Sequence, residues 1–277
     1  MNILLNEQHE LRSGWKFIAY WLLFLLLTFI VFQPFPTAPQ TQLERLVLNT
    51  LPFFPALAAL IVMARFLDKV PIAAFGAGFH RHWTRHVLWG LAVSAGMLIL
   101  GTLINAVWGI TMVWSASGTS SRSLLITLVV LTMSAAQEEL LFRGYPFQVL
   151  VKGIGAWPAI LIMSIAFGTV HLLNPNATIL GAINTILAGL LLSMAYLKTR
   201  SLWLPYGLHL GWNVGLGFVL GYPLSGIDID SLWKTVARGP QWMAGGLYGP
   251  EGGLVATIVF IAACVAIRSN KMRVSEK

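Results

Sequence analysis

The stretch SLLITLVVLTMSAAQEELLFRG, residues 123–144, places two adjacent glutamates and an arginine at the end of an apolar run. Its apolar part, residues 123–141, approaches the roughly 20 residues that an α-helix needs to cross a membrane. A charged side chain in hydrocarbon is costly and is rarely retained there without a partner or a function. The stretch therefore predicts a membrane helix that carries chemistry.

Apolar runs of similar length recur along the chain, which contains 57% hydrophobic and only 10% charged residues. Ordinary soluble domains contain roughly 25% charged residues, so this composition excludes that class. The sequence predicts an all-α fold, a polytopic transmembrane helical bundle of about eight spans. The predicted spans are residues 17–33, 46–64, 87–109, 123–141, 156–172, 179–197, 202–221 and 252–267.

The distribution of basic residues predicts the orientation of the bundle. With a cytoplasmic N-terminus, 14 of the 18 Lys and Arg residues fall on the cytoplasmic side, as the positive-inside rule requires. Both termini are then cytoplasmic, and we expect a multi-pass protein of a bacterial inner (plasma) membrane. The net charge of +8 is explained by topology, so no nucleic-acid partner is predicted. Cys264 is the single cysteine, which excludes an intramolecular disulfide.

The chain divides into three parts within one integral membrane domain. Residues 1–120 hold N-terminal membrane helices, residues 121–221 hold a catalytic helical core, and residues 222–277 hold an extracytoplasmic loop and the last helix. The intramembrane polar groups of interest all lie in the central part. We therefore expect the chemistry of the protein to reside there.

The acidic pair in EELLFR has two different predicted roles. Glu139 and Arg143 are four residues apart with the acid first, the favourable order for an ion pair on one helical face. Glu138 projects about 100° away from Glu139 around the helix, so it remains free for proton chemistry. A purely structural bracing role for both acids is the alternative.

Two further motifs place polar side chains on separate apolar helices. In FGTVH, Phe167 and His171 lie four residues apart, so the aromatic ring can pack against and orient the imidazole. In HLGWN, His209 and Asn213 share one helical face. A separate row of small residues should face a neighbouring helix at close range; it consists of Gly207, Gly211 and Gly215.

Together these residues supply a carboxylate, two imidazoles and a carboxamide, which suit a water-activating base with donors to an oxyanion. The residues Glu138, His171 and His209 could instead be three ligands of a divalent metal such as zinc, with an open position for water. The chain contains no HExxH motif, so a metal site would be assembled from distant segments. Both chemistries remain open at this point.

The three motifs in this order, over about residues 120–220, resemble the CPBP family of CAAX-protease-like intramembrane peptidases. EELLFR matches EExxxR, FGTVH matches FxxxH, and HLGWN matches HxxxN. The resemblance implies an all-helical membrane bundle around the site. It also implies that Glu138 and His171 activate water, that His209 and Asn213 support the oxyanion, and that Glu139 and Arg143 are supporting residues. Both a metallopeptidase and a glutamate-based mechanism have been described for this family, so no cofactor is assigned.

The resemblance also implies the partners. The expected substrate is a membrane-associated or prenylated peptide or protein, met in a setting of membrane lipids. Two other functions compete with an endopeptidase. Buried Glu and His residues also serve proton-coupled transporters, and a non-catalytic membrane scaffold or bacteriocin-immunity protein could keep the same helices. The sequence carries no signal for an oligomeric state.

A cluster of His80, His82 and His86 lies beside Arg81 and Arg85. Histidine tracts can bind metal, but the neighbouring basic and aromatic residues favour anchoring at lipid headgroups.

The predicted spans pose one geometric problem. Glu138 lies near the cytoplasmic end of its helix, whereas His171 lies near the opposite end of the next one. We expect residues 144–155 to form a re-entrant or interfacial stretch that offsets the two helices. The alternative is that the true helix boundaries differ from the predicted ones by a turn or more.

Overall fold

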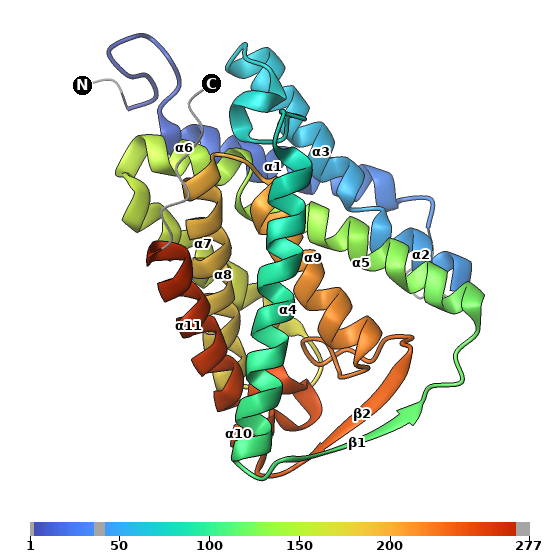
Figure 1. Cartoon of the computed structure of the whole chain (residues 1–277). Helices are drawn as coiled ribbons and strands as arrows, with labels where there is room; N and C mark the ends of the chain where they lie inside the picture. The colour runs from blue at the N-terminus through green and yellow to red at the C-terminus, as the bar shows by residue number, and fades with distance from the viewer. Residues whose placement is uncertain (1–2, 36–41, 270–277) are drawn as a thin grey trace.

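The fold is a bundle of long helices with a small β-ribbon at one end (Figure 1). The computed structural model describes residues 3–35 and 42–269, and these residues are 71% helical. The elements are α1 (Ser13–Phe32), α2 (Gln42–Thr50), α3 (Phe53–Val62), η1 (Met63–Leu67), η2 (Ile72–Phe75), α4 (Trp83–Val107), β1 (Thr111–Ala116), α5 (Ser121–Phe142), α6 (Tyr145–Ile154), α7 (Ala156–Val170), η3 (His171–Leu173), α8 (Ile179–Thr199), α9 (Trp203–Asn213), η4 (Val214–Val219), β2 (Trp233–Arg238), α10 (Gln241–Ala244), η5 (Gly246–Tyr248), η6 (Pro250–Gly252) and α11 (Leu254–Ser269).

In the described part of the chain, 6 helices are long and apolar enough to cross a membrane. They are Ser13–Phe32, Leu46–Leu67, Trp83–Val107, Ser121–Ile154, Ala156–Leu173 and Ile179–Thr199. The last two predicted spans appear as shorter helical segments, α9 continued by η4, and α11. An integral membrane protein with several apolar helices is therefore confirmed, while the count of eight spans and the cytoplasmic termini stay predictions.

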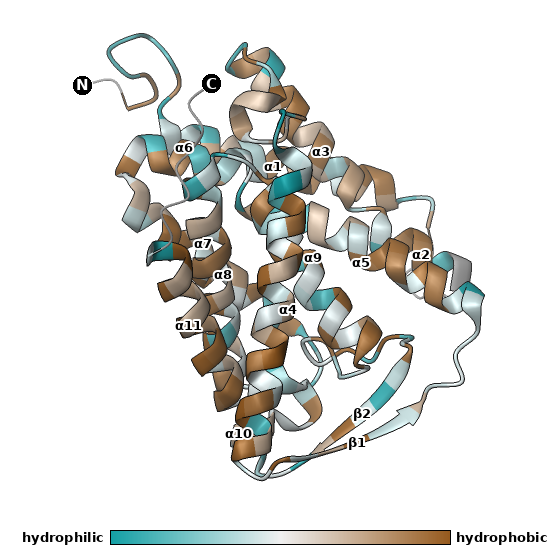
Figure 2. Ribbon diagram, in the orientation of Figure 1, coloured by the Kyte–Doolittle hydropathy of each residue, from teal (hydrophilic) through white to brown (hydrophobic). Residues whose placement is uncertain are grey.

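Large apolar side chains cover the outside of the bundle, as a lipid environment requires. Leu22 and Phe29 of α1 are 62% and 65% exposed, and Ile99 of α4 and Val265 of α11 are each 62% exposed. In Figure 2 the apolar colour dominates α11 and much of α4 and α7. Such a surface would promote aggregation in water, whereas in a membrane it contacts lipid tails.

The all-α prediction missed a two-stranded antiparallel ribbon. Strand β1 pairs with β2 in a register that matches Thr111 with Arg238 and Ala116 with Trp233. The two strands come from loops that are more than 100 residues apart in sequence, so periodicity within either loop could not predict the pairing. The ribbon joins the loop after α4 to the long loop before α11 (Figure 1).

Helix α6 reverses the chain between α5 and α7. A Cβ atom at Gly144 would lie 2.3 Å from the carbonyl oxygen of Leu140, so this turn requires glycine. At the other end of α6, Gly155 has a φ of 87°, a conformation that glycine adopts readily. Tyr145 of α6 stacks on Tyr20 of α1 at a centroid distance of 5.6 Å, which holds α6 on the bundle.

The glycine row of α9 faces α4, as the sequence predicts. A Cβ atom at Gly207 would lie 2.4 Å from the carbonyl oxygen of Val87, and one at Gly90 would lie 2.4 Å from the backbone nitrogen of Leu208. A Cβ at Gly211 would meet Ser94 at 3.0 Å. The two backbones are therefore in direct contact, which sets the position of α9 and of the polar residues that it carries.

Gly90→Ala should destabilise the protein, because the new methyl group forces α4 away from α9. Overpacking of this kind costs about 1–3 kcal/mol. The measurement is thermal unfolding in detergent, with Gly96→Ala as the matched control. Gly96 lies on the same helix with nothing within 4 Å of its Cβ position, so its variant should be as stable as wild type. Equal melting temperatures for the two variants would contradict the close helix contact.

Candidate active site

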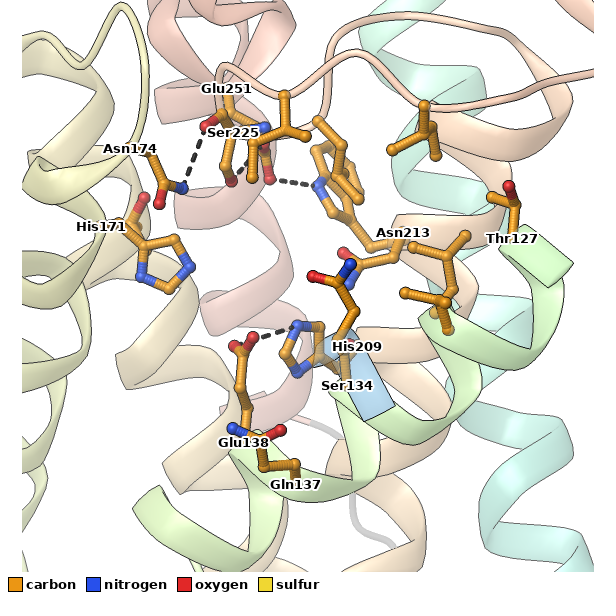
Figure 3. Close-up of a pocket in the computed structure, with 18 of the residues that line it drawn as sticks. Thr127, Ser134, Gln137, Glu138, His171, Asn174, His209, Asn213, Ser225 and Glu251 are labelled. Carbon is orange, nitrogen blue, oxygen red and sulfur yellow. Dashed lines mark hydrogen bonds and ion pairs between the residues drawn. The ribbon is translucent and has the colours of Figure 1, made fainter. Parts of the chain in front are cut away.

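A cavity of about 1380 Å³ brings the predicted site residues together. Its lining includes Glu138 from α5, His171 from η3, and His209 and Asn213 from α9. Figure 3 shows the side chains of these residues around the open space. Apolar side chains of α1 and α2 line another part, whereas serines, threonines and two aspartates line the part near the ribbon. The cavity is therefore amphipathic.

The buried carboxylate of Glu139 connects two helices. Its Oε1 accepts hydrogen bonds from Arg143 Nη1 at 3.1 Å and from His209 Nδ1 at 2.9 Å. Arg143 is fully buried, donates from Nη2 to the carbonyl of Gly189 at 3.3 Å, and lies over the Phe167 ring at 4.5 Å. The predicted pairing of Glu139 with Arg143 is formed, and its extension to His209 was not predicted from the sequence.

His209 lies between the two glutamates. Because Nδ1 is directed at Glu139, Nε2 faces Glu138, at 3.7 Å from Oε2. Two carboxylates and one guanidinium leave one negative charge in this buried group, and a protonated His209 neutralises it. Glu138 is the more accessible acid, with its side chain 28% exposed against 1% for Glu139. Within the described residues, Glu138 Oε2 is buried against His209 without a hydrogen bond, so the exposed part of this side chain is what a water or a substrate can contact.

His171 is oriented by its own helix. Its Nδ1 donates a hydrogen bond to the carbonyl of Phe167 at 2.7 Å, which leaves the lone pair of a neutral ring on Nε2. The rings of Phe167 and His171 lie 4.7 Å apart, as the four-residue spacing predicts. Phe167 also contacts His209, with a centroid distance of 6.0 Å. One aromatic ring therefore contacts both histidines and Arg143.

The same contacts resolve the problem of depth. Phe142, at the end of α5, packs on Phe167 of α7 at a centroid distance of 5.0 Å. Glu138 lies about one turn before Phe142 on α5, and His171 lies about one turn after Phe167 on α7. Because α6 reverses the chain between these helices, both side chains line the same cavity. The stretch predicted to offset the two helices, residues 144–155, contains the helix α6.

With this geometry in place, the comparison with known families is informative. Residues 119–215 match one family model, described as type II CAAX prenyl endopeptidase Rce1-like. This segment is Rce1-like. The match confirms the resemblance to CPBP-type intramembrane proteases and supports, at the level of the family, a CAAX-type intramembrane endopeptidase. No curated protein matches the chain.

The Rce1-like segment contains all of the predicted site residues, including Asn213 near its end. Asn213 lines the cavity one turn beyond His209, where α9 passes into the π-helical turn η4. Short π-helical turns are rare and often occur at functional sites. The turn follows His209 and Asn213, for which the family resemblance implies oxyanion support.

The three proposed metal ligands line one cavity but do not form a ligand set. Across residues 3–35 and 42–269, no group of three or more His, Cys, Asp or Glu side chains lies close enough to hold a metal ion. Both ring nitrogens of His209 face carboxylates, which leaves neither of them directed at an open metal position. The arrangement does not fit a three-ligand zinc site, so the chemistry is derived from the protein groups alone.

Sequence reasoning missed a third glutamate in the cavity wall. Glu251, in η6, is buried and accepts hydrogen bonds from Trp212 and Ser225 (Figure 3). It lies outside the predicted spans and beyond the Rce1-like segment. The available signal was an acid between glycines, YGPEGG, directly before an apolar helix.

The histidine cluster lies away from this cavity. His80 Nδ1 accepts a hydrogen bond from the backbone N–H of His82 at 3.2 Å, and its Nε2 lies 3.0 Å from Ser201 Oγ. Burial, and then the neighbouring His82, lower the pKa of His80. Both ring nitrogens of this neutral histidine are in use, which agrees with a structural role rather than metal binding.

Arg143→Ala should leave Glu139 as a buried, poorly compensated charge. Breaking one partner of a buried pair costs about 3–5 kcal/mol, so we expect loss of folded protein. Size-exclusion chromatography and thermal unfolding in detergent measure this. Lys152→Ala is the control, because its pair with Glu10 is 3.9 Å long and exposed. A folded Arg143→Ala protein of wild-type stability would refute the role of the buried network.

Proposed function

We propose that this chain is an intramembrane endopeptidase of the CAAX-protease-like type. It hydrolyses a peptide bond of a membrane-associated or lipidated protein, with water activated by Glu138 and His171. The observation that carries the proposal is the accessible Glu138, 3.7 Å from His209 in a cavity that His171 and Asn213 also line. That these groups occur within the Rce1-like segment adds to the support.

In the proposed reaction, the Glu138 carboxylate accepts a proton from a water molecule as the water oxygen attacks the scissile carbonyl carbon. The neutral Nε2 of His171 accepts a hydrogen bond from the same water. The carbonyl π bond opens and places a negative charge on its oxygen. When the C–N bond breaks, the proton held by Glu138 passes to the leaving amine, and the products are a carboxylic acid and an amine.

His209 and Asn213 are the proposed donors to the tetrahedral oxyanion. A protonated His209 carries a hydrogen on Nε2, while Glu139 holds the opposite side of the ring through Nδ1 at 2.9 Å. Because Glu139 is itself held by Arg143, the imidazole needs little reorganisation during the reaction. Arg143, Glu139 and Phe167 would act through this orientation rather than on the substrate.

The shape of the cavity favours an amphiphilic substrate. Trp21 and Phe24 of α1 and Leu46 of α2 line its apolar part, where a membrane-embedded segment or a lipid chain could lie. The glutamate and the histidines occupy the polar interior. A prenylated peptide and a hydrophobic peptide without a lipid are therefore the two probes to compare.

Glu138→Gln should abolish cleavage in a folded protein, because a neutral amide cannot accept the proton. The expected loss is about 10²- to 10⁴-fold in kcat. The measurement is cleavage of a prenylated CAAX peptide and of a membrane-peptide library by purified protein in detergent. Glu10→Gln, at an exposed site away from the cavity, is the matched control.

Three results would count against the proposal. If folded wild type cleaves no peptide, a scaffold or transporter function would be favoured. If Glu138→Gln retains wild-type cleavage, another base is responsible. If a chelator abolishes cleavage and Zn²⁺ restores it, the metal-free route is wrong.

Asn213→Ala should lower kcat with a smaller change in KM, because an oxyanion donor acts mainly in the transition state. Loss of one such donor costs about 10²- to 10³-fold in kcat. Steady-state kinetics on the best peptide measure the split between the two constants. An increase in KM alone would instead assign Asn213 to substrate binding.

A further inference from the structure

Glu251 makes an unusually complete set of hydrogen bonds for a buried carboxylate. Trp212 Nε1 donates to its Oε1 at 2.8 Å, while the backbone nitrogen and hydroxyl of Ser225 donate to its Oε2 at 2.6 Å and 2.7 Å. Only 9% of the residue is exposed. Donors occupy both carboxylate oxygens, which makes Glu251 a fixed acceptor between two segments of the chain.

One branch from Glu251 leads to α9. Trp212 directly precedes Asn213 and lies three residues after His209. On its other side the indole packs against Phe260 of α11, at a centroid distance of 5.0 Å. The hydrogen bond to Glu251 therefore adds a second restraint, beside the contact with α4, on the end of α9 that carries the two proposed oxyanion donors.

The other branch leads to His171. The carbonyl of Ser225 accepts a hydrogen bond from Asn174 Nδ2 at 3.0 Å. Asn174 ends the short η3 turn that begins at His171. Figure 3 shows Asn174, Ser225 and Glu251 in a connected row above His171. A single carboxylate is thus linked to both histidine-bearing elements.

The loop that carries Glu251 is also held through its backbone. Asn184 Nδ2 already donates to the carbonyls of Glu251 and Gly253, at 2.7 Å and 2.9 Å. Thr257 in turn donates to Asn184 Oδ1 at 2.6 Å. These bonds hold the start of α11 through the backbone, which leaves the carboxylate to hold Trp212 and Ser225.

We propose that Glu251 is a positioning residue that couples η3 to the end of α9. It holds His171 and His209 at a fixed relative position across the cavity, although it lies outside the Rce1-like segment. The inference rests on the proposed function for its effect on catalysis. Its structural part, the coupling of the two elements, is independent of the reaction.

Glu251→Gln tests the coupling with a minimal change of shape. The amide keeps one acceptor oxygen, and its NH₂ group must face either the indole N–H or the Ser225 donors. Two hydrogen-bond donors then face each other inside the protein, and the hydrogen bond to either Trp212 or Ser225 is lost. Trp212→Phe removes the indole donor, so the conflict at Oε1 disappears in the double variant.

The activity measurement is a double-mutant cycle on kcat and KM with folded, detergent-solubilised full-length protein. We expect Glu251→Gln to lower kcat about 10- to 100-fold with KM within about threefold, because small displacements of catalytic groups have effects of this size. The double variant should be no slower than Glu251→Gln alone. Glu10→Gln controls for the loss of a carboxylate.

Hydrogen–deuterium exchange supplies a readout that does not depend on activity. Glu251→Gln should raise exchange in peptides that cover residues 171–176 and 209–219, as well as residues 222–232. A kcat within twofold of wild type, additive effects in the cycle, or faster exchange confined to residues 222–253 would each overturn the proposal. If wild type cleaves no peptide, the proposed function fails, and exchange at the two histidine segments alone decides whether the coupling exists.

Discussion

The site depends on one buried hydrogen-bonded network, in which the Glu139 carboxylate is shared between Arg143 and His209. Separated from water, these charges are stable only together, because each compensates for the desolvation of the others. The network joins α5 to α9, and Arg143 extends it to α8 through Gly189. The adjacent Glu138 is left with an accessible carboxylate in the cavity. Because the two glutamates lie on different faces of α5, Glu139 is buried in the network and Glu138 lines the cavity.

The surrounding bundle makes that network possible by close backbone approach. Glycines bring α4 and α9 into direct contact, and α6 reverses the chain so that α7 returns along the end of α5. The Phe167 ring then touches Arg143 and both histidines. Small residues and one aromatic side chain therefore determine where the polar groups meet. Such packing is the main source of specificity between helices in lipid, where burial of apolar surface provides little discrimination.

Features that depend on spacing within one helix could be predicted from the sequence. These include the apolar helices, the pairing of Glu139 with Arg143, and the contact of Phe167 with His171. Features that depend on distant segments could not be predicted, because helical periodicity contains no information about them. The β-ribbon, the bond from His209 to Glu139, and the position of Glu251 belong to this class. The roles of the site residues in catalysis are predictions that kinetics must test.

The ribbon also constrains the order of events during biosynthesis. Strand β1 is complete at Ala116, but its partner β2 begins only at Trp233, after α5 to α9 have been made. At about 5–20 residues per second, the ribosome needs on the order of 10 s to reach the second strand. The Rce1-like segment, residues 119–215, is synthesised during this interval, before the ribbon can form. Pairing of the strands is therefore a late step, and the polar part of the cavity acquires its final wall only when synthesis is nearly finished.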